Sequence, residues 1–283
     1  MVAICSLIKN PFNFDFWLDY HISIGIDYFF LRVEETPELE SILCNYRDKV
    51  YVEYHNENFD KTNNIFTLAD RQINFVNKCI NISKSKSIEW LFHVDTDELI
   101  WCKSDNLKKY FDNFDKKFDY AHVSNYEAVY PRDNLENPFL QTNKFYGMNL
   151  QDKFLSYING KSACRIKENS STNSPHIFNG ERFCVPIQSM IILHYESATF
   201  ELWFGKFHNS DRGIVNEKVK NYQLGWAVCG FTNKSIEFIN NNPIEEARKF
   251  YNDSKVKPYY ETSNLSTLFW TPQLPEKNSN WSR

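Results

Sequence analysis

The sequence predicts an α/β fold whose first half forms a mostly parallel, doubly wound sheet. Two observations carry this prediction. Apolar segments of strand length stand at residues 2–8 and 90–94, and the segments between the predicted strands show helical spacing of their apolar residues. Strands that alternate with helices are typical of parallel sheets. Ligands of such sheets bind beyond the carboxyl ends of the strands, so functional residues are expected there.

Each element of the first half has a local signal. The first strand, 2–8, is small and β-branched and stops at Asn10-Pro11. A helix is expected over 14–23, because Phe14, Trp17 and Leu18 recur at three- and four-residue spacing and Gly25 can terminate it. The remaining predicted elements are strands at 27–33, 50–54 and 90–94 and helices at 38–46 and 70–82.

The second half is less regular, and its elements are predicted with longer connections. Residues 134–179 are rich in Asn, Ser and Lys, which favours strands joined by long loops. No repeat or linker interrupts the chain, so we expect one domain followed by a C-terminal helical extension. The predicted elements are strands at 120–129 and 190–195 and helices at 107–114, 200–209 and 244–253.

Composition excludes several classes of protein. A net charge of -4 in 283 residues argues against nucleic acid as a partner. Seven cysteines without a CxxC pair argue against a disulfide framework or a structural zinc site, and favour a reducing, cytoplasmic location. The apolar segment 2–8 is too short for a signal peptide or a membrane span, which leaves only peripheral membrane contact open.

Aromatic residues make up 17 % of the chain, which is high. Most of these rings are expected to pack in the core, and a few could stack on sugars or bases. The candidates for such stacking are Tyr130, Trp203 and Trp226.

Two carboxylates stand at the end of the apolar strand 90–94, in the segment Asp95-Thr96-Asp97-Glu98. Asp95 and Asp97 are two residues apart, so their side chains share a face if the strand continues through them. Paired hard oxygen ligands suit Mg²⁺ or Mn²⁺, and such a cation can neutralise the phosphates of a nucleotide. The other interpretation is a turn whose carboxylates cap a short helix at 98–101.

The order and spacing of several motifs resemble the GT-A glycosyltransferases of family 2, in the subgroup related to family 92. The resemblance covers about residues 1–210. It is carried by Lys9-Asn10, Trp17, Tyr20-His21, Gly25-Ile26-Asp27, Arg71-Gln72, the segment from Trp90 to Glu98, Gly160-Lys161-Ser162, Pro175-His176, and His194-Tyr195 followed by Lys206.

This resemblance implies a GT-A fold, which is a Rossmann-like sheet with an irregular acceptor-side half. The implied GT-A domain spans 1–235, with a donor half at about 1–105 and an acceptor half at about 106–235, and residues 236–283 form the helical extension and tail. The implied enzyme moves a hexosyl or pentosyl group from a nucleotide sugar, most simply a UDP-sugar, to a glycan acceptor with inversion, as in polysaccharide biosynthesis.

The resemblance also implies roles for single residues. Asp95 and Asp97 would hold the Mn²⁺ or Mg²⁺, and His194 would complete its shell, whereas His21 and His93 are expected to pack. His194 could also be a buried histidine satisfied by the backbone. The residues expected to contact the nucleotide-sugar donor are Ser6, Asn10, Glu34, Arg71, Asp95, Lys161 and His176.

The chain departs from the family pattern at three places near the donor. Pro11 and Phe16 stand where the family has acidic residues. The acidic residue that usually ends the second strand is displaced, so that Glu34 or Glu35 would take its place. These departures leave the nucleobase open. Arg71 could reach the donor or form a surface ion pair with Asp70 or Glu89.

An inverting displacement needs a general base beside the acceptor hydroxyl. The candidates are Glu127, which follows a predicted strand among aromatic residues, Asp133, and Glu181 in a Gly-Glu-Arg turn. Each could equally be a solvated or ion-paired carboxylate, and the choice among them stays open.

Three other classes of protein compete with the transferase. A metal-dependent nucleotidyltransferase would carry a glycine-rich basic loop after the first strand, and Lys9-Asn10-Pro11-Phe12 contains no glycine. A phosphohydrolase with an aspartyl nucleophile would carry Asp-x-Asp near its first strand instead of its fourth. A non-catalytic carbohydrate-binding protein would more often be all-β.

Overall fold

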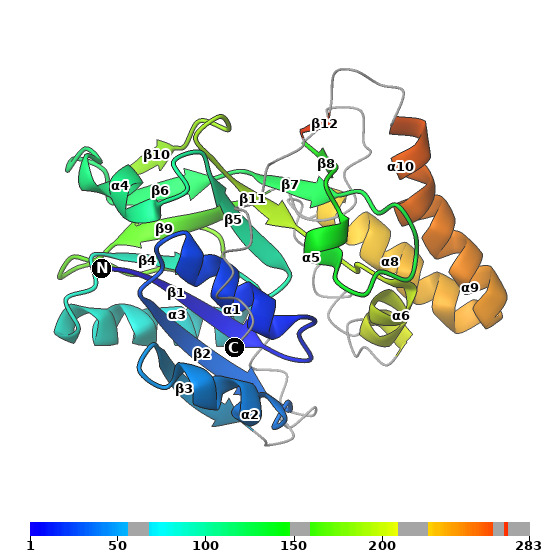
Figure 1. Cartoon of the computed structure of the whole chain (residues 1–283), viewed down its shortest axis with the longest axis horizontal. Coiled ribbons are helices and arrows are strands. Elements are labelled where there is room, and N and C mark those ends of the chain that lie inside the picture. Colours follow the sequence, from blue (N-terminus) through cyan, green and yellow to red (C-terminus); the bar gives the residue numbers. More distant parts are fainter. Residues whose placement is uncertain (56–67, 148–158, 209–225, 263–268, 271–283) are drawn as a thin grey trace. The chain divides into compact units, whose positions relative to one another are not determined.

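The computed structural model describes residues 1–55, 68–147, 159–208, 226–262 and 269–270 (Figure 1). The chain divides into two compact units, and each is described by itself. The first consists of Met1–Ser124, Asn159–Ile192 and Leu274–Arg283, and the second of Asn125–Ile158 and Leu193–Gln273. Neither unit is one continuous segment. The boundaries of these units differ from those of the predicted domains. Helix α8 (Trp226–Asn241), for example, runs across the predicted boundary at residue 235.

The first unit is built on a mixed, mostly parallel sheet. Its strands are β1 (Val2–Ile8), β2 (Tyr28–Glu34), β3 (Val50–His55), β4 (Trp90–His93), β6 (Tyr120–Val123), β9 (Lys161–Arg165) and β10 (Arg182–Cys184). In the described part of the chain their order is β10-β6-β9-β4-β1-β2-β3 (Figure 1). The pairs β1–β2, β2–β3, β1–β4 and β6–β10 are parallel, whereas β9 is antiparallel to both β4 and β6.

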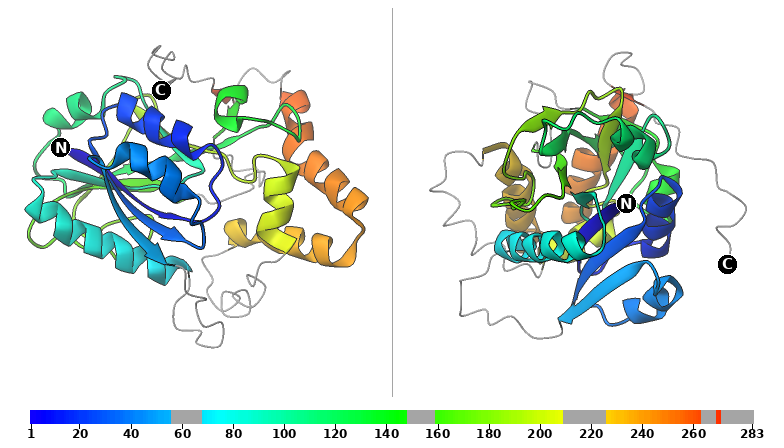
Figure 2. Two further views of the ribbon diagram at one scale, coloured as in Figure 1. Left: turned by 60° about the horizontal axis from the view of Figure 1, so that its bottom comes forward. Right: turned by 90° about the vertical axis from the view of Figure 1, so that its left-hand side faces the viewer.

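Two helices cover opposite faces of this sheet, α1 (Phe14–Ser23) and α3 (Leu68–Ser85) (Figure 2). The alternation of side chains along β2 assigns neighbouring residues to the two faces. Phe29 contacts Trp17 of α1 with ring centroids 5.7 Å apart. Phe30 belongs instead to the buried cluster that includes Phe75 and Cys79 of α3. Because both faces are covered, β1 is buried at every position, as the apolar segment predicts.

Shorter elements complete the first unit. Strand β5 (Glu98–Cys102) follows β4 closely, and Lys103 N–H beyond it donates to Ser189 O, 2.9 Å away, just before β11 (Met190–His194). The helical segments are α2 (Leu39–Leu43), the 3₁₀ turn η1 (Cys44–Tyr46) and α4 (Leu107–Asp112). Within the described ranges, no helix is long and apolar enough to cross a membrane.

The second unit combines a small sheet with C-terminal helices. Strands β12 (Phe269–Trp270), β8 (Phe145–Tyr146), β7 (Asn125–Ala128) and β11 are neighbours in that order. Tyr195 is fully buried, with Phe139 and Phe145 packed edge-on against its ring. The helical segments are α5 (Pro138–Gln141), α6 (Phe200–His208), α8, α9 (Ile244–Tyr251), the π-helical turn η2 (Asn252–Val256) and α10 (Lys257–Thr262).

The α/β prediction with a mostly parallel sheet is confirmed. Two local expectations are wrong. Residues 98–101 form strand β5 instead of a capped helix, because their side chains are taken into the core. The strand expected over 120–129 is divided into β6 and β7, because the chain passes between the units after Ser124. Within the predicted loop-rich segment 134–179, residues 148–158 lie outside the described part.

Candidate functional site

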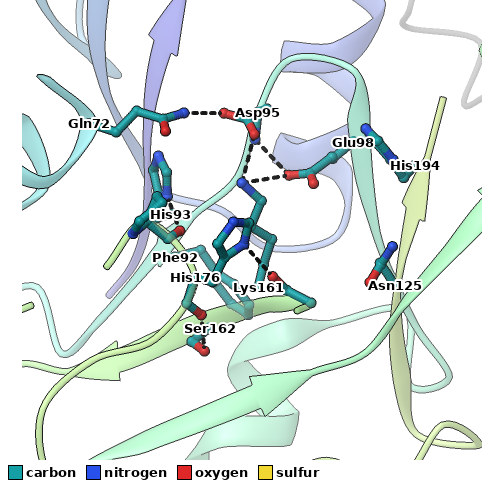
Figure 3. A network of polar contacts seen from close by, with 12 residues as sticks. Gln72, Phe92, His93, Asp95, Glu98, Asn125, Lys161, Ser162, His176 and His194 are labelled. Atoms are coloured by element: carbon teal, nitrogen blue, oxygen red, sulfur yellow. Dashed lines mark hydrogen bonds and ion pairs between the residues drawn. The ribbon is translucent and has the colours of Figure 1, made fainter. Parts of the chain in front are cut away.

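The carboxyl end of β4 carries a polar network in the first unit (Figure 3). All four residues of β4 are buried, so the strand end is a rigid point from which Asp95 projects. Its Oδ2 accepts a hydrogen bond from Lys161 Nζ at 2.6 Å, and its Oδ1 accepts one from Gln72 Nε2 at 3.0 Å. The backbone N–H of Asp95 donates to Glu98 Oε2 at 2.7 Å. Both carboxylate oxygens of Asp95 are therefore engaged.

Lys161 is a buried cation between two carboxylates. Its side chain is 1 % exposed, and its Nζ lies 2.6 Å from Asp95 and 3.6 Å from Glu98, which is itself fully buried. Burial disfavours the charged ammonium, but the charges of Asp95 and Glu98 outweigh burial and raise the pKa of Lys161. Burial likewise opposes ionisation of Asp95, and the charge of Lys161 outweighs it and lowers the pKa of that carboxyl. The pair is thus fully charged at neutral pH.

Asp97 lies in the turn that joins β4 to β5, and its side chain is half-buried. The backbone fixes this turn, because Glu98 N–H donates to Asp95 O at 3.2 Å. Trp17 Nε1 donates to Glu98 O at 2.8 Å, which ties the turn to helix α1. Strand β4 ends at His93, so Asp97 stands beyond the carboxyl end of the strand, where a carboxylate can meet a ligand.

Two histidines beside Lys161 are held neutral. Burial and then the charge of Lys161 lower the pKa of His93 to about 4 and that of His176 to about 3. His93 Nδ1 donates to Pro175 O at 2.6 Å, and His176 Nδ1 donates to Gly160 O at 2.9 Å. Each carbonyl can only accept, so Nδ1 carries the hydrogen in both rings. His176 therefore reaches the network beside Asp95 and Lys161 as a neutral imidazole (Figure 3).

The other predicted donor residues lie in or just after β1, at the end of β2 and on helix α3. Ser6 is buried within β1, and Asn10 follows that strand with its backbone N–H bonded to Thr36 Oγ1 at 3.0 Å. Glu34 ends β2 and is 2 % exposed. It accepts two hydrogen bonds from Arg71, at 3.0 and 3.1 Å, and one from Arg32 at 2.9 Å. Arg71 thus pairs with Glu34, a partner that the sequence alternatives did not include.

The second unit holds a separate row of buried polar residues. His194 Nδ1 lies 2.7 Å from Glu127 Oε1, and His194 Nε2 lies 3.7 Å from Glu196 Oε2. Lys206 Nζ donates to both oxygens of Glu196, at 2.6 and 2.8 Å. Burial opposes ionisation of Glu196, but the charge of Lys206 outweighs it and lowers the pKa of the carboxyl. Glu196 is therefore an anion at neutral pH.

The remaining candidates for a general base are occupied or exposed. In the second unit, Asp133 accepts a hydrogen bond from Arg248 Nη1 at 2.8 Å. In the first unit, Glu181 lies in an exposed turn, and its backbone is bonded to Asp119. The stacking candidates Tyr130 and Trp203 are fully buried in the second unit, so they serve its core. The side chain of Trp226 lies outside the described residues.

The structure thus brings Asp95, Lys161 and His176 together in the first unit, and Glu127 and His194 together in the second. Sequence reasoning missed Glu98 and Glu196. Strand β11 ends at His194 and Glu196 stands in the turn beyond it, so alternation along the strand gives no signal for Glu196.

The sequence model of glycosyltransferase family 92 matches residues 2–225. The chain belongs to this family. The family 2 part of the predicted resemblance stays a prediction.

Two glycosyltransferase-like proteins of Arabidopsis thaliana are similar to this family 92 chain. At3g57200 is 27 % identical over 229 residues, which are 65 % of this chain and 44 % of that protein. At2g41451 is 26 % identical over 229 residues, which are 65 % of this chain and 51 % of that protein. The chain therefore spans about half the length of these curated relatives.

Among solved structures, similarity to this family 92 chain is low. The 4-diphosphocytidyl-2C-methyl-D-erythritol synthase from Anaerococcus prevotii aligns over 67 % of this chain and 90 % of that one, with 9 % identity and a TM-score of 0.37. HddC from Yersinia pseudotuberculosis aligns over 72 % of this chain and 97 % of that one, with 9 % identity and a TM-score of 0.35.

Proposed function

We propose that this chain transfers a sugar from a nucleotide-sugar donor to a glycan acceptor on a GT-A fold, with inversion at the anomeric carbon. The observation that carries the proposal is the end of β4, where a buried parallel strand delivers the Asp95–Asp97 pair to the ligand edge of the sheet. Membership of family 92 supports the reaction class. The fully charged Lys161–Asp95 pair supports a site built for an ionic ligand, because it keeps polar atoms fixed at that edge.

The proposed donor requires a divalent cation, Mn²⁺ or Mg²⁺. When bound, the cation would neutralise the diphosphate leaving group. Asp95 and Asp97 are the proposed carboxylate ligands in the first unit. Each carboxylate oxygen has two lone pairs, so the hydrogen bonds that Asp95 accepts from Lys161 and Gln72 leave it able to bind the cation. In the second unit, His194 Nε2 and Glu196 Oε2 form a proposed ligand pair, and their nitrogen and oxygen donors suit Mn²⁺.

The chain's own residues would position the donor, and the acceptor hydroxyl would displace the diphosphate. The acceptor hydroxyl attacks the anomeric carbon, the bond from that carbon to the diphosphate breaks, and the hydroxyl proton passes to a carboxylate base. Glu127 and Asp133 already bond to His194 and Arg248. Neither is therefore assigned as the base. The proposed donor contacts stay Ser6, Asn10, Glu34, Arg71, Asp95, Lys161 and His176.

The test is the thermal stability of the chain with a panel of nucleotides and nucleotide sugars, in Mn²⁺ or in EDTA. A ligand at 100 times its Kd stabilises the folded state by about 2.7 kcal/mol. We expect such a shift with one nucleotide, most simply UDP, in Mn²⁺ only. The Asp97→Asn variant should lose it, and Asp112→Asn, an exposed carboxylate on α4, should keep it.

A second measurement distinguishes the enzyme classes. Release of the free nucleotide from a UDP-sugar, with or without an added glycan, would support the transferase. If no nucleotide stabilises the wild-type chain in the presence of metal, the donor site is refuted. Release of pyrophosphate from a nucleoside triphosphate and a sugar phosphate would instead identify a nucleotidyltransferase.

A further inference from the structure

The hydrogen on the His194 ring can be placed from its neighbours in the second unit. Its Nδ1 lies 2.7 Å from Glu127 Oε1, and both residues are almost fully buried. A carboxylate oxygen can only accept, so Nδ1 carries a hydrogen. In a neutral imidazole the other nitrogen, Nε2, then holds the lone pair. The bond to Glu127 therefore decides which nitrogen of His194 can bind a cation.

Glu127 is itself held in place. Asn125 Nδ2 donates to the same oxygen, Oε1, at 3.1 Å, and Asn125 and Glu127 stand on one face of β7. The second oxygen, Oε2, is shielded from solvent and accepts no hydrogen bond within the described residues. A general base has to reach the hydroxyl of an incoming acceptor. A carboxylate committed to a histidine on one oxygen and enclosed on the other is poorly placed for that task.

The opposite side of the His194 ring faces an anion. Nε2 lies 3.7 Å from Glu196 Oε2, which exceeds the length of a hydrogen bond. Lys206 binds both oxygens of Glu196 and keeps the carboxylate fixed and charged. A nitrogen lone pair and a carboxylate oxygen at this separation can both ligate one cation without a change of rotamer.

We propose that Glu127 is a positioning residue: it holds His194 in the Nδ1–H tautomer, so that Nε2 faces Glu196 as a ligand for a divalent cation. This inference rests on the proposed function for the identity of the cation, but the tautomer does not depend on it. It replaces the sequence-based expectation that Glu127 is a candidate general base. A carboxylate behind a ligating histidine orients the ring and increases its basicity.

The test uses Glu127→Gln in the full chain, with Glu201→Gln as the matched control. Glutamine keeps the size of the side chain, but its amide can donate to Nδ1 and so favour the Nε2–H tautomer. Glu201 is an exposed carboxylate of the same unit, 65 % exposed, that pairs with Arg248. Circular dichroism and thermal unfolding confirm that both variants are folded, and Glu127→Asp serves as the conservative variant should Glu127→Gln unfold.

Two readouts are measured. The ¹⁵N shifts of the His194 ring, assigned in histidine-labelled protein with a His194→Gln variant and recorded at a pH where the ring is neutral, report the tautomer without metal. We expect Nδ1–H in the wild type and in Glu201→Gln, and a shift toward Nε2–H in Glu127→Gln. Mn²⁺ affinity, from the electron paramagnetic resonance of free Mn²⁺, should fall roughly 10–100-fold in Glu127→Gln and stay unchanged in Glu201→Gln.

The outcomes separate the two proposals. Equal Mn²⁺ affinity in the wild type and Glu127→Gln overturns the positioning role and leaves the metal-dependent function standing. An unchanged tautomer in Glu127→Gln overturns it as well. If the wild type binds no Mn²⁺, the cation of the proposed function is refuted, and the tautomer shift still decides whether Glu127 orients the ring.

Discussion

Replacing Lys161 with methionine removes a buried positive charge and keeps a side chain of similar length. The variant leaves Asp95 and Glu98 as neighbouring carboxylates without their cation. Removing one partner of a buried ion pair costs roughly 3–5 kcal/mol. The Asp95 side chain is 32 % exposed and can regain water, whereas Glu98 is fully buried, so we expect the lower end, about 3 kcal/mol.

This loss can be measured by calorimetry on the metal-free protein at pH 7. For a unit of this size, about 3 kcal/mol lowers the midpoint of unfolding by roughly 6–12 °C. The matched control is Lys167→Met, which removes a surface cation that lies 2.5 Å from Asp119 and is 37 % exposed. A surface ion pair contributes less than about 1 kcal/mol, so this midpoint should move by no more than a few degrees.

The double variant Lys161→Met with Asp95→Asn isolates the cause. Removing the negative charge of Asp95 should restore part of the loss, because only Glu98 is then left uncompensated. Equal destabilisation by Lys161→Met and Lys167→Met, or no recovery in the double variant, would refute the reasoning. Lys161 would then stabilise the sheet only through the packing of its aliphatic stem.

Three further predictions concern the first unit. Burial lowers the pKa of His21 to about 3, so between about pH 6.5 and 3 the unfolded state binds more protons than the folded state. The free energy of unfolding should therefore fall as the pH drops through this range, by up to about 1.4 kcal/mol per pH unit. In urea titrations at several pH values, His21→Phe should flatten this slope. Gly160 has φ +61°, and an added Cβ would lie 2.2 Å from Val123 O, so Gly160→Ala should lose more than about 1 kcal/mol in urea unfolding; an unchanged midpoint would contradict the strain. Trp17→Phe removes the N–H that donates to Glu98 O and should lower the free energy of unfolding by about 1–3 kcal/mol, measured by thermal unfolding. A smaller loss would show that water replaces the hydrogen bond.

Much of the first unit could be predicted because its signals are local. The predicted bounds of strand β1 and helix α1 agree with the structure. A fully apolar run, or apolar residues at helical spacing, indicates from the segment alone which of its side chains are buried. The edge position of Asp95 followed from the strand before it. These inferences need no knowledge of distant residues.

What sequence reasoning missed depends on contacts between distant segments. Strand β9 is buried although it begins with Lys161-Ser162, because the polar groups of these residues find partners in other elements, such as Asp95 and the backbone of His176. No pattern of hydrophobicity detects such a strand. Nor does any such pattern pair Glu127 with His194, which stands 67 residues further along the chain.

The place of β9 between β4 and β6 affects how the chain is made. Lys161 is synthesised 66 residues after Asp95, which at 5–20 residues per second is a delay of roughly 3–13 s. During that interval β4 lacks the neighbour that will cover its edge, and Asp95 and Glu98 lack the ammonium of Lys161 that neutralises them. A nascent chain that has released β1 to β4 can therefore pair its parallel strands, but its central sheet closes only when the ribosome has delivered β9.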